Sequence, residues 1–176
     1  MNHAFVDESV RPGSYLLTAA IIPSIKLQDF TRAVRDAQPA RRHRSHMSAL
    51  DDRRRRQVLD AYVRQGTPAH IAVADYLGGN DQPARERCLR SLLRAFVDLH
   101  VGVVVLDTRG EGRDRLDRRF IAAAIAASAA PTGLHYSHRG SASESLLSLP
   151  DAYGWAWGAG GQWKKRIETV VTVIDP

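Results

Sequence analysis

Two adjacent carboxylates, Asp7 and Glu8, follow a short apolar run at residues 4–6. The run has the composition of a buried strand. Because side chains alternate between the two faces of a strand, we expect at least one of these carboxylates to point into the interior. A carboxylate is costly to bury unless it is paired or bound to a metal ion. Asp7 and Glu8 are therefore the first candidate metal ligands.

Two further acids end strand-like runs. Asp75 follows the run 70–74, and Asp107 follows the β-branched run 101–106. Ligand sites of α/β sheets lie at the carboxyl ends of the strands, where these two acids would stand. Each of them could also cap the helix predicted after it. The residues alone leave both as candidates beside Asp7.

A fourth candidate, Asp151, belongs to the segment 144–157. Pro150 suits the first turn of a helix, and Asp151 follows it directly. Its carboxylate either compensates the dipole at the helix start or is carried to a site by a helix packed on the core. Glu144, at the beginning of the same segment, is a further acid.

Basic residues outnumber acidic ones, with 25 Lys and Arg against 19 Asp and Glu and a formal net charge of +6. This balance favours polyanionic partners, nucleic acid first; an arginine-rich composition without binding is the alternative. The candidate phosphate contacts are Arg41, Arg42, Arg44 and His46 in a basic, extended segment, and Arg53 and Arg54 at the start of a predicted helix. Cations oppose the dipole at a helix start, and an acidic ligand would offset that cost.

The composition describes a globular protein. With 176 residues, 44% hydrophobic and 25% charged, the chain is expected to form a single domain over residues 1–176. No run approaches the roughly 18 apolar residues that a membrane helix needs. The start of the chain lacks the layout of an export signal, and a single cysteine suits a reducing compartment. We therefore expect a cytoplasmic protein with no membrane partner.

The elements that must position these residues can be read from the apolar patterns. Two runs separated by a Pro-Gly turn predict a hairpin over residues 4–22. Further strands are predicted at 70–77, 101–106, 134–137 and 167–174, and helices at 27–37, 51–65, 81–97, 116–125 and from 150 onward. A hairpin followed by strand–helix units predicts an α/β fold with a mixed sheet and helices on both faces. The last predicted strand could lie at an edge of the sheet and pair with a second copy of the chain, so a homodimer is possible.

Features spread over most of the chain resemble the bacterial family named domain of unknown function 3800, which has a ribonuclease H-like fold. They are the first strand with Asp7, Glu8 and Ser9, the second strand at 15–22, the histidine His46, the strand ending in Asp107 and the late helix motif at 147–152. The chain departs from the commonest pattern by Pro150 before the late aspartate and by a basic tripeptide before His46.

The resemblance implies a nuclease or closely related phosphodiesterase that uses Mg²⁺ or Mn²⁺. These hard cations prefer carboxylate and water oxygens. Two of them roughly 4 Å apart can activate water and stabilise the leaving oxygen. By this reading Asp7 bridges the metals, and Asp107 and Asp151 complete the shell. Glu144 is a further candidate, and so is Glu8, although it should face away from Asp7.

Three alternatives stay open at this point. Asp75 could replace Asp107, because its strand pairs beside the first one in the ribonuclease H order. A non-catalytic nucleic-acid-binding module could retain the fold without the chemistry. A protein-interaction component could instead use exposed tryptophans, namely Trp155, Trp157 and Trp163. The nucleic acid itself is either DNA or RNA.

Overall fold

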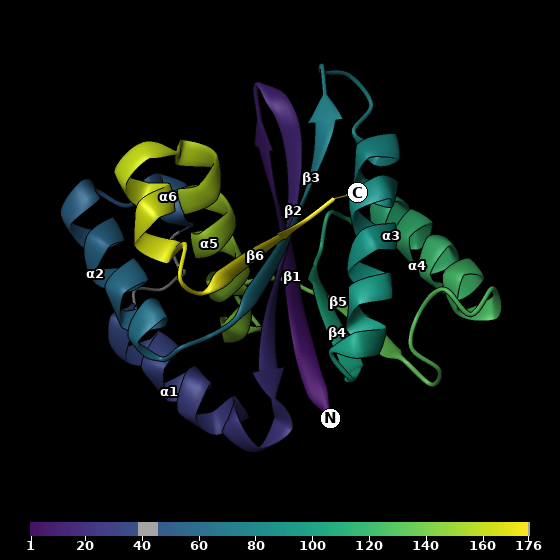
Figure 1. The fold of residues 1–176 in the computed structure, drawn as a ribbon, viewed down its shortest axis with the longest axis horizontal. Coiled ribbons are helices and arrows are strands. Elements are labelled where there is room, and N and C mark those ends of the chain that lie inside the picture. The colour runs from purple at the N-terminus through teal and green to yellow at the C-terminus, as the bar shows by residue number, and fades with distance from the viewer. Residues whose placement is uncertain (39–45, 176) are drawn as a thin grey trace.

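The computed structural model describes residues 1–38 and 46–175, which form a six-stranded mixed sheet in the order β5-β4-β1-β2-β3-β6 (Figure 1). The strands are β1 Asn2–Arg11, β2 Gly13–Pro23, β3 Ala69–Tyr76, β4 Val101–Asp107, β5 His135–Arg139 and β6 Val171–Ile174. β1 and β2 form an antiparallel hairpin, and β4 pairs parallel to β1 on its other side. The predicted α/β mixed sheet that opens with a hairpin is confirmed.

Helices cover both faces of the sheet, as predicted (Figure 1). They are α1 Leu27–Ala37, α2 Asp52–Arg64, α3 Gln82–Asp98, α4 Glu111–Ala126, α5 Ser148–Ala159 and α6 Gly161–Ile167. Short 3-10 turns precede α1, α2 and α5, namely η1 Ser24–Lys26, η2 Met47–Ala49 and η3 Ser145–Leu147. Within the ranges that the structure describes, no helix combines the length and the apolar character needed to cross a membrane.

Each face of the sheet has its own apolar core because side chains alternate along the strands. In β1, Ala4 and Val6 enter the core beneath α3 and α4, whereas Phe5 enters the core beneath α1, α2, α5 and α6. The alternation then sends Asp7 to the face of Phe5 and Glu8 to the face of Val6. The carboxylates of Asp7 and Glu8 thus lie on opposite faces of the sheet.

The C-terminal part differs from the predicted edge strand at 167–174. Gly160, with a φ of +70°, ends α5, and α6 begins at the next residue. α6 then extends to Ile167, which is fully buried, so the last strand starts only at Val171. The loose alternation at 167–174 therefore combines the end of a helix with a short strand.

Most of the basic segment that was predicted to be extended is not tested by the structure. Residues 41–45, with Arg41, Arg42 and Arg44, lie outside the described residues. From His46 onward the chain turns into η2. The N-terminus of α2 is capped as predicted, because the Asp51 side chain accepts a hydrogen bond from the backbone N–H of Arg54 at 2.8 Å.

Candidate active site

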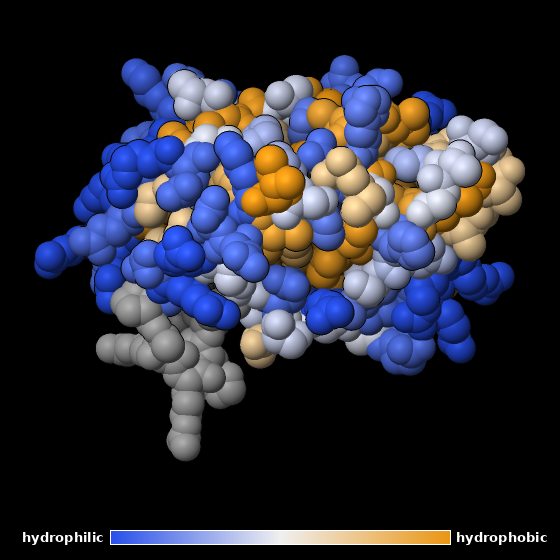
Figure 2. All heavy atoms as spheres, turned by 90° about the horizontal axis from the view of Figure 1, so that it is seen from below, coloured by the Kyte–Doolittle hydropathy of each residue, from blue (hydrophilic) through white to orange (hydrophobic). Residues whose placement is uncertain are grey.

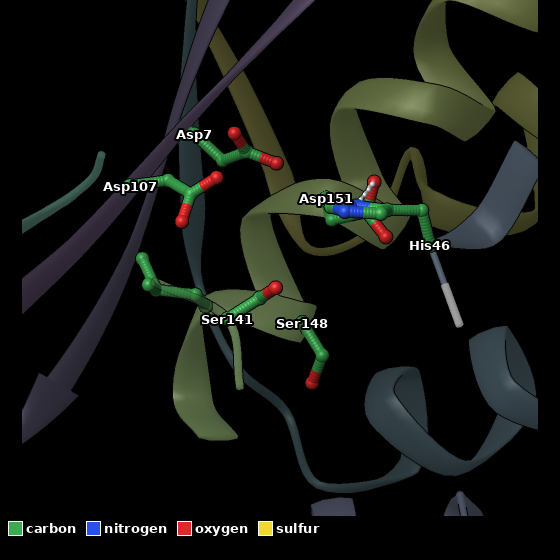
Figure 3. Close-up of a pocket in the computed structure, with 7 residues that line it drawn as sticks. Asp7, His46, Asp107, Ser141, Ser148 and Asp151 are labelled. Atoms are coloured by element: carbon green, nitrogen blue, oxygen red, sulfur yellow. Dashed lines mark ion pairs between the residues drawn. The ribbon is translucent and has the colours of Figure 1, made fainter. Parts of the chain in front are cut away.

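One pocket gathers side chains from several separate segments (Figure 3). It is lined by Asp7, His46, Asp107, Ser141, Leu147, Ser148 and Asp151. The three acids come from β1, from the end of β4 and from the first turn of α5. Three of the acids singled out from the sequence, and the one histidine, therefore line the same pocket.

Asp7 and Asp107 lie at the same edge of the sheet because β1 and β4 are adjacent and parallel. Val6 is the register partner of Leu106, so the next residue on each strand is an aspartate. Both side chains project toward the region that Asp151 faces from α5 (Figure 3). The sheet thus brings two acids to a third that a helix carries.

The carboxylate of Asp7 is the most deeply placed of the three. The residue is 8% exposed, and its Oδ1 accepts a hydrogen bond from the backbone N–H of Glu8 at 2.8 Å. Burial, reinforced by the negative charges of Asp151, Glu8 and Asp107, raises the pKa of Asp7 well above its ordinary value. A cation in the pocket would relieve this cost.

Asp151 holds one side of the pocket together with His46. Its Oδ2 accepts a hydrogen bond from the backbone N–H of Met47 at 2.9 Å, and its Oδ1 lies 3.6 Å from Nδ1 of His46. This contact with Asp151 raises the pKa of His46 to about 9, against the partial burial of the ring. His46 is therefore positively charged at neutral pH, and its charge faces the pocket beside that of Asp151.

Asp107 offers an oxygen atom without a partner. Its Oδ1 is buried and has no hydrogen-bond partner in the described part of the chain, whereas the backbone N–H groups of Thr108 and Ser141 interact with the carboxylate group. Burial and the charge of Glu8 raise the pKa of Asp107, while the positive charge of His46 and these backbone N–H groups lower it. Buried polar atoms are nearly always hydrogen-bonded or bound to an ion, so this oxygen indicates where a ligand would be held.

Glu8 faces the other side of the sheet, where it joins a buried ion network. Its carboxylate lies 2.9 Å from Nη1 of Arg85 and 3.2 Å from Nε of Arg109. Arg85, whose side chain is 1% exposed, also donates to both carboxylate oxygens of Asp117 over 2.7–3.0 Å. Burial alone would raise the pKa of Asp117, but hydrogen bonds from His138 and Arg85 lower it to about 2. Glu8 is thus engaged away from the pocket.

Asp75 and Glu144 also lie outside the pocket lining. Asp75 is exposed near the end of β3, and β3 pairs with β2 and β6. The strand beside β1 is instead the one that ends in Asp107. Glu144 caps η3, where its Oε1 accepts a hydrogen bond from the backbone N–H of Leu146 at 3.2 Å.

The residues of the pocket fit a hard divalent cation that is only partly held by protein. Within the described ranges, no group of three or more His, Cys, Asp or Glu side chains is spaced to hold an ion unaided. Mg²⁺ commonly binds one or two carboxylates and completes its shell with water and substrate phosphates. Asp7 and Asp107 supply such carboxylates, and one of their oxygens is buried without a partner. The donor set therefore suits an open site and not a closed protein cage.

Comparisons with known proteins support the fold. No protein-family model and no curated protein matches the sequence. Among solved structures, ribonuclease HII from Archaeoglobus fulgidus, in a complex with PCNA, is similar with a TM-score of 0.56 and 14% identity, over 96% of this chain and 76% of that one. Bst ribonuclease HIII in complex with Mn²⁺ has a TM-score of 0.46 and 14% identity, over 90% of this chain and 55% of that one. The chain has a ribonuclease H-like fold.

Three residues were not found from the sequence, namely the pocket residues Ser141 and Ser148 and the buried Arg85. Ser148 lines the pocket, and the signal for it was its spacing of three residues from Asp151, which places both side chains on one side of α5. Arg85 was missed because it looked like one of many surface arginines. It precedes Leu89 by four residues, and so belongs to the buried stripe of α3. An arginine on an apolar stripe is a signal for a buried acidic partner.

Proposed function

We propose that this chain is a divalent-metal-dependent nuclease or closely related phosphodiesterase that hydrolyses phosphodiester bonds of DNA or RNA. The observation that carries the proposal is the convergence of Asp7, Asp107 and Asp151 on one pocket of a ribonuclease H-like fold. The name of the similar ribonuclease HII describes cleavage of RNA by that protein, and the proposal extends phosphodiester cleavage to this chain. Membership of the family named domain of unknown function 3800 belongs to the same proposal.

We assign the residues of the pocket the following roles in binding the metal ion and the phosphate. Asp7 and Asp107 would hold Mg²⁺ or Mn²⁺ at the strand ends, and Asp151, which lines the other side of the pocket on α5, would hold water of the ion's shell. When bound, such an ion supplies positive charge to the phosphate and lowers the pKa of coordinated water. His46 would attract the phosphate to the rim of the pocket. Its positive charge also offsets the negative charge of Asp151.

The proposal is tested by incubating labelled single- and double-stranded DNA and RNA with the protein and Mg²⁺ or Mn²⁺. Cleavage should require the metal and should fall by at least about a hundredfold in Asp7→Asn and in Asp151→Asn, because both lose charge at the ion. Asp98→Asn, which changes an exposed acid at the end of α3, is the matched control and should keep full activity.

A second candidate function is a nucleic-acid-binding module without catalysis. It is favoured by the open donor set, since no described cluster holds an ion unaided. If wild-type protein binds nucleic acid but cleaves none of the substrates with either metal, and Asp7→Asn binds equally well, the nuclease proposal is wrong and the binding module takes its place.

A further inference from the structure

The net positive charge of the chain is concentrated on two neighbouring helices. α2 and α6 together contain eight Lys and Arg but only two acids, Asp52 and Asp60. Both acids are already paired, Asp52 with Arg55 at 2.9 Å and Asp60 with Arg166 at 2.5 Å. Asp51 and Glu168 flank the two helices, but among the described residues the remaining cations form no ion pair with any acid. α2 and α6 lie together on one side of the molecule, beside α5 (Figure 1).

Indole rings hold several of these cations in place. The ammonium of Lys164 lies 3.8 Å from the ring centre of Trp157, and the guanidinium of Arg56 lies 5.8 Å from that of Trp163. Trp163 in turn packs edge-on against Trp155 with 5.2 Å between ring centres. A cation held over an aromatic face keeps its N–H donors for another ligand. For Lys164 and Arg56 the described residues provide no hydrogen-bond acceptor or ion pair that would use them.

The cationic helices are connected to the pocket through Met47 and α5. The backbone N–H of Met47 donates to Asp151, while its carbonyl accepts from Nε of Arg55 at 3.1 Å. Arg55 lies over Trp155 at 4.5 Å from the ring centre. Trp155 follows Asp151 by four residues, one turn along α5, so both side chains stand on the same side of that helix. α2 thus starts near the rim of the acidic pocket, whereas α6 begins beyond the other end of α5.

In the view from below in Figure 2, hydrophilic side chains lie on the side where α1 and α2 lie in Figure 1 and also on the opposite side, while apolar side chains occupy the middle of the face.

We infer that the surface formed by Arg53, Arg54, Arg56, Lys164 and Lys165, here called the α2–α6 surface, binds the phosphate backbone of a nucleic acid strand whose scissile part enters the pocket. The inference rests on the proposed function. It adds the path that the nucleic acid strand follows, from the α2–α6 surface to the pocket. Because cations lie over the indole rings, the surface offers charge to phosphates and not stacking faces to bases. Binding should therefore be independent of sequence and strongly dependent on salt.

The test compares two charge reversals of equal size. Lys164→Glu with Lys165→Glu changes the α2–α6 surface, and Arg115→Glu with Arg119→Glu changes exposed arginines of α4 on the other face of the sheet. Fluorescence anisotropy of a labelled oligonucleotide in EDTA measures binding without cleavage. We expect the first variant to lose affinity roughly tenfold or more, and the dependence of log K on log salt to become shallower by about 1.4 to 1.8 for two lost phosphate contacts. The α4 variant should lose less than about threefold.

A second variant guards against a folding defect at the Lys164–Trp157 contact. Arg53→Glu with Lys165→Glu changes two exposed side chains that make no described side-chain contact, and it should weaken binding to a similar extent. Equal losses in the α2–α6 and α4 variants would mean attraction by net charge alone and would overturn the inference. So would unchanged binding in the α2–α6 variants, or equally strong competition by polyglutamate, which would indicate an acidic protein partner. Because EDTA prevents cleavage, these outcomes are separate from the fate of the nuclease proposal, which cleavage by wild type decides.

Discussion

The side chain of Asp7 lowers the stability of the folded protein as long as no ion is bound in the pocket. Its carboxylate is buried and close to other acids, and its pKa is raised for both reasons. For an acid with a raised pKa, the folded state favours the protonated form. The stability of the metal-free protein should therefore fall as the pH rises from the ordinary aspartate pKa to the raised one.

Replacing Asp7 by Asn should consequently stabilise the metal-free protein at neutral pH. Asparagine keeps an oxygen for the backbone N–H of Glu8 but removes the buried charge. We expect a gain on the order of 1 kcal/mol, or roughly 2 to 4 °C in the melting temperature for a chain of this length. Thermal melts in EDTA between pH 4 and pH 8 measure it, and the gain should grow with pH. A variant that is less stable than wild type throughout this range would contradict the account of the burial.

His46 should titrate with a pKa of about 9 in the metal-free protein. Its pKa is raised chiefly by contact with Asp151, so in Asp151→Asn it should return toward the ordinary value of about 6.5. Histidine NMR signals followed from pH 5 to pH 10 measure both values. The stabilisation from a raised histidine pKa is complete below about 6.5 and disappears as the pH passes 9.

The same ion pair has a small effect on stability. Since the side chain of His46 is 55% exposed, solvent screening limits the contribution to less than about 1 kcal/mol. His46→Gln should therefore destabilise the protein slightly at pH 6 and have almost no effect at pH 10. A titration near 6.5 in wild type would mean that the two side chains are apart in solution.

At the scale of elements, local patterns were sufficient to place most helices and strands. The spacing of Phe30 and Val34 predicted α1 with its observed bounds, because both side chains are buried on one stripe. Strand order could not be obtained in this way. Asp75 and Asp107 both end apolar strands, and only the pairing of β4 with β1 distinguishes them. That pairing depends on contacts between residues about a hundred positions apart. Patterns within a short stretch of sequence cannot predict such contacts.

The ion network on the far face of the sheet connects the elements that carry the pocket. Arg85 on α3 holds Glu8, the neighbour of Asp7, and Glu8 also contacts Arg109, which follows Asp107 by two residues. The ends of β1 and β4 are thus tied together from behind. The network stabilises their relative position only while it is complete, because each buried charge depends on its partners.

Arg85→Met should therefore be strongly destabilising. It leaves Asp117, which is fully buried, without its guanidinium partner, and we expect a loss of about 3 to 5 kcal/mol in the free energy of unfolding. Urea denaturation measures the loss. Combining Arg85→Met with Asp117→Leu should recover part of it, because the unpaired buried charge is gone. Arg94→Met, at an exposed position of the same helix, is the control and should stay within about 0.5 kcal/mol of wild type.

Considered as a whole, the molecule separates its charges by face. Acids of β1, β4 and α5 meet in the pocket, cations that have no acidic partner among the described residues lie on α2 and α6 over the same face of the sheet, and the far face carries the neutralising network around Arg85. The sequence indicated the acids and the positive net charge separately. It could not indicate that they share one side, because this depends on which face each helix covers. A homodimer through β6, at the edge of the sheet, stays a prediction, as does the cytoplasmic location.

The convergence of distant segments on the pocket predicts that ion binding stabilises the whole fold. Asp7, Asp107 and Asp151 come together only in the folded chain, so an ion held by them binds the folded state alone. At a free concentration about 100 times its Kd, such an ion adds about 2.7 kcal/mol, or roughly 5 to 10 °C in the melting temperature of this chain. Melts in a Mn²⁺ or Mg²⁺ series should show this rise for wild type and for Asp98→Asn, but not for Asp7→Asn. An equal rise in Asp7→Asn would place the ion elsewhere on the molecule. No rise in wild type would mean that the ion binds only together with the phosphates of a substrate. Melts repeated with an uncleavable phosphorothioate oligonucleotide would then show a metal-dependent rise.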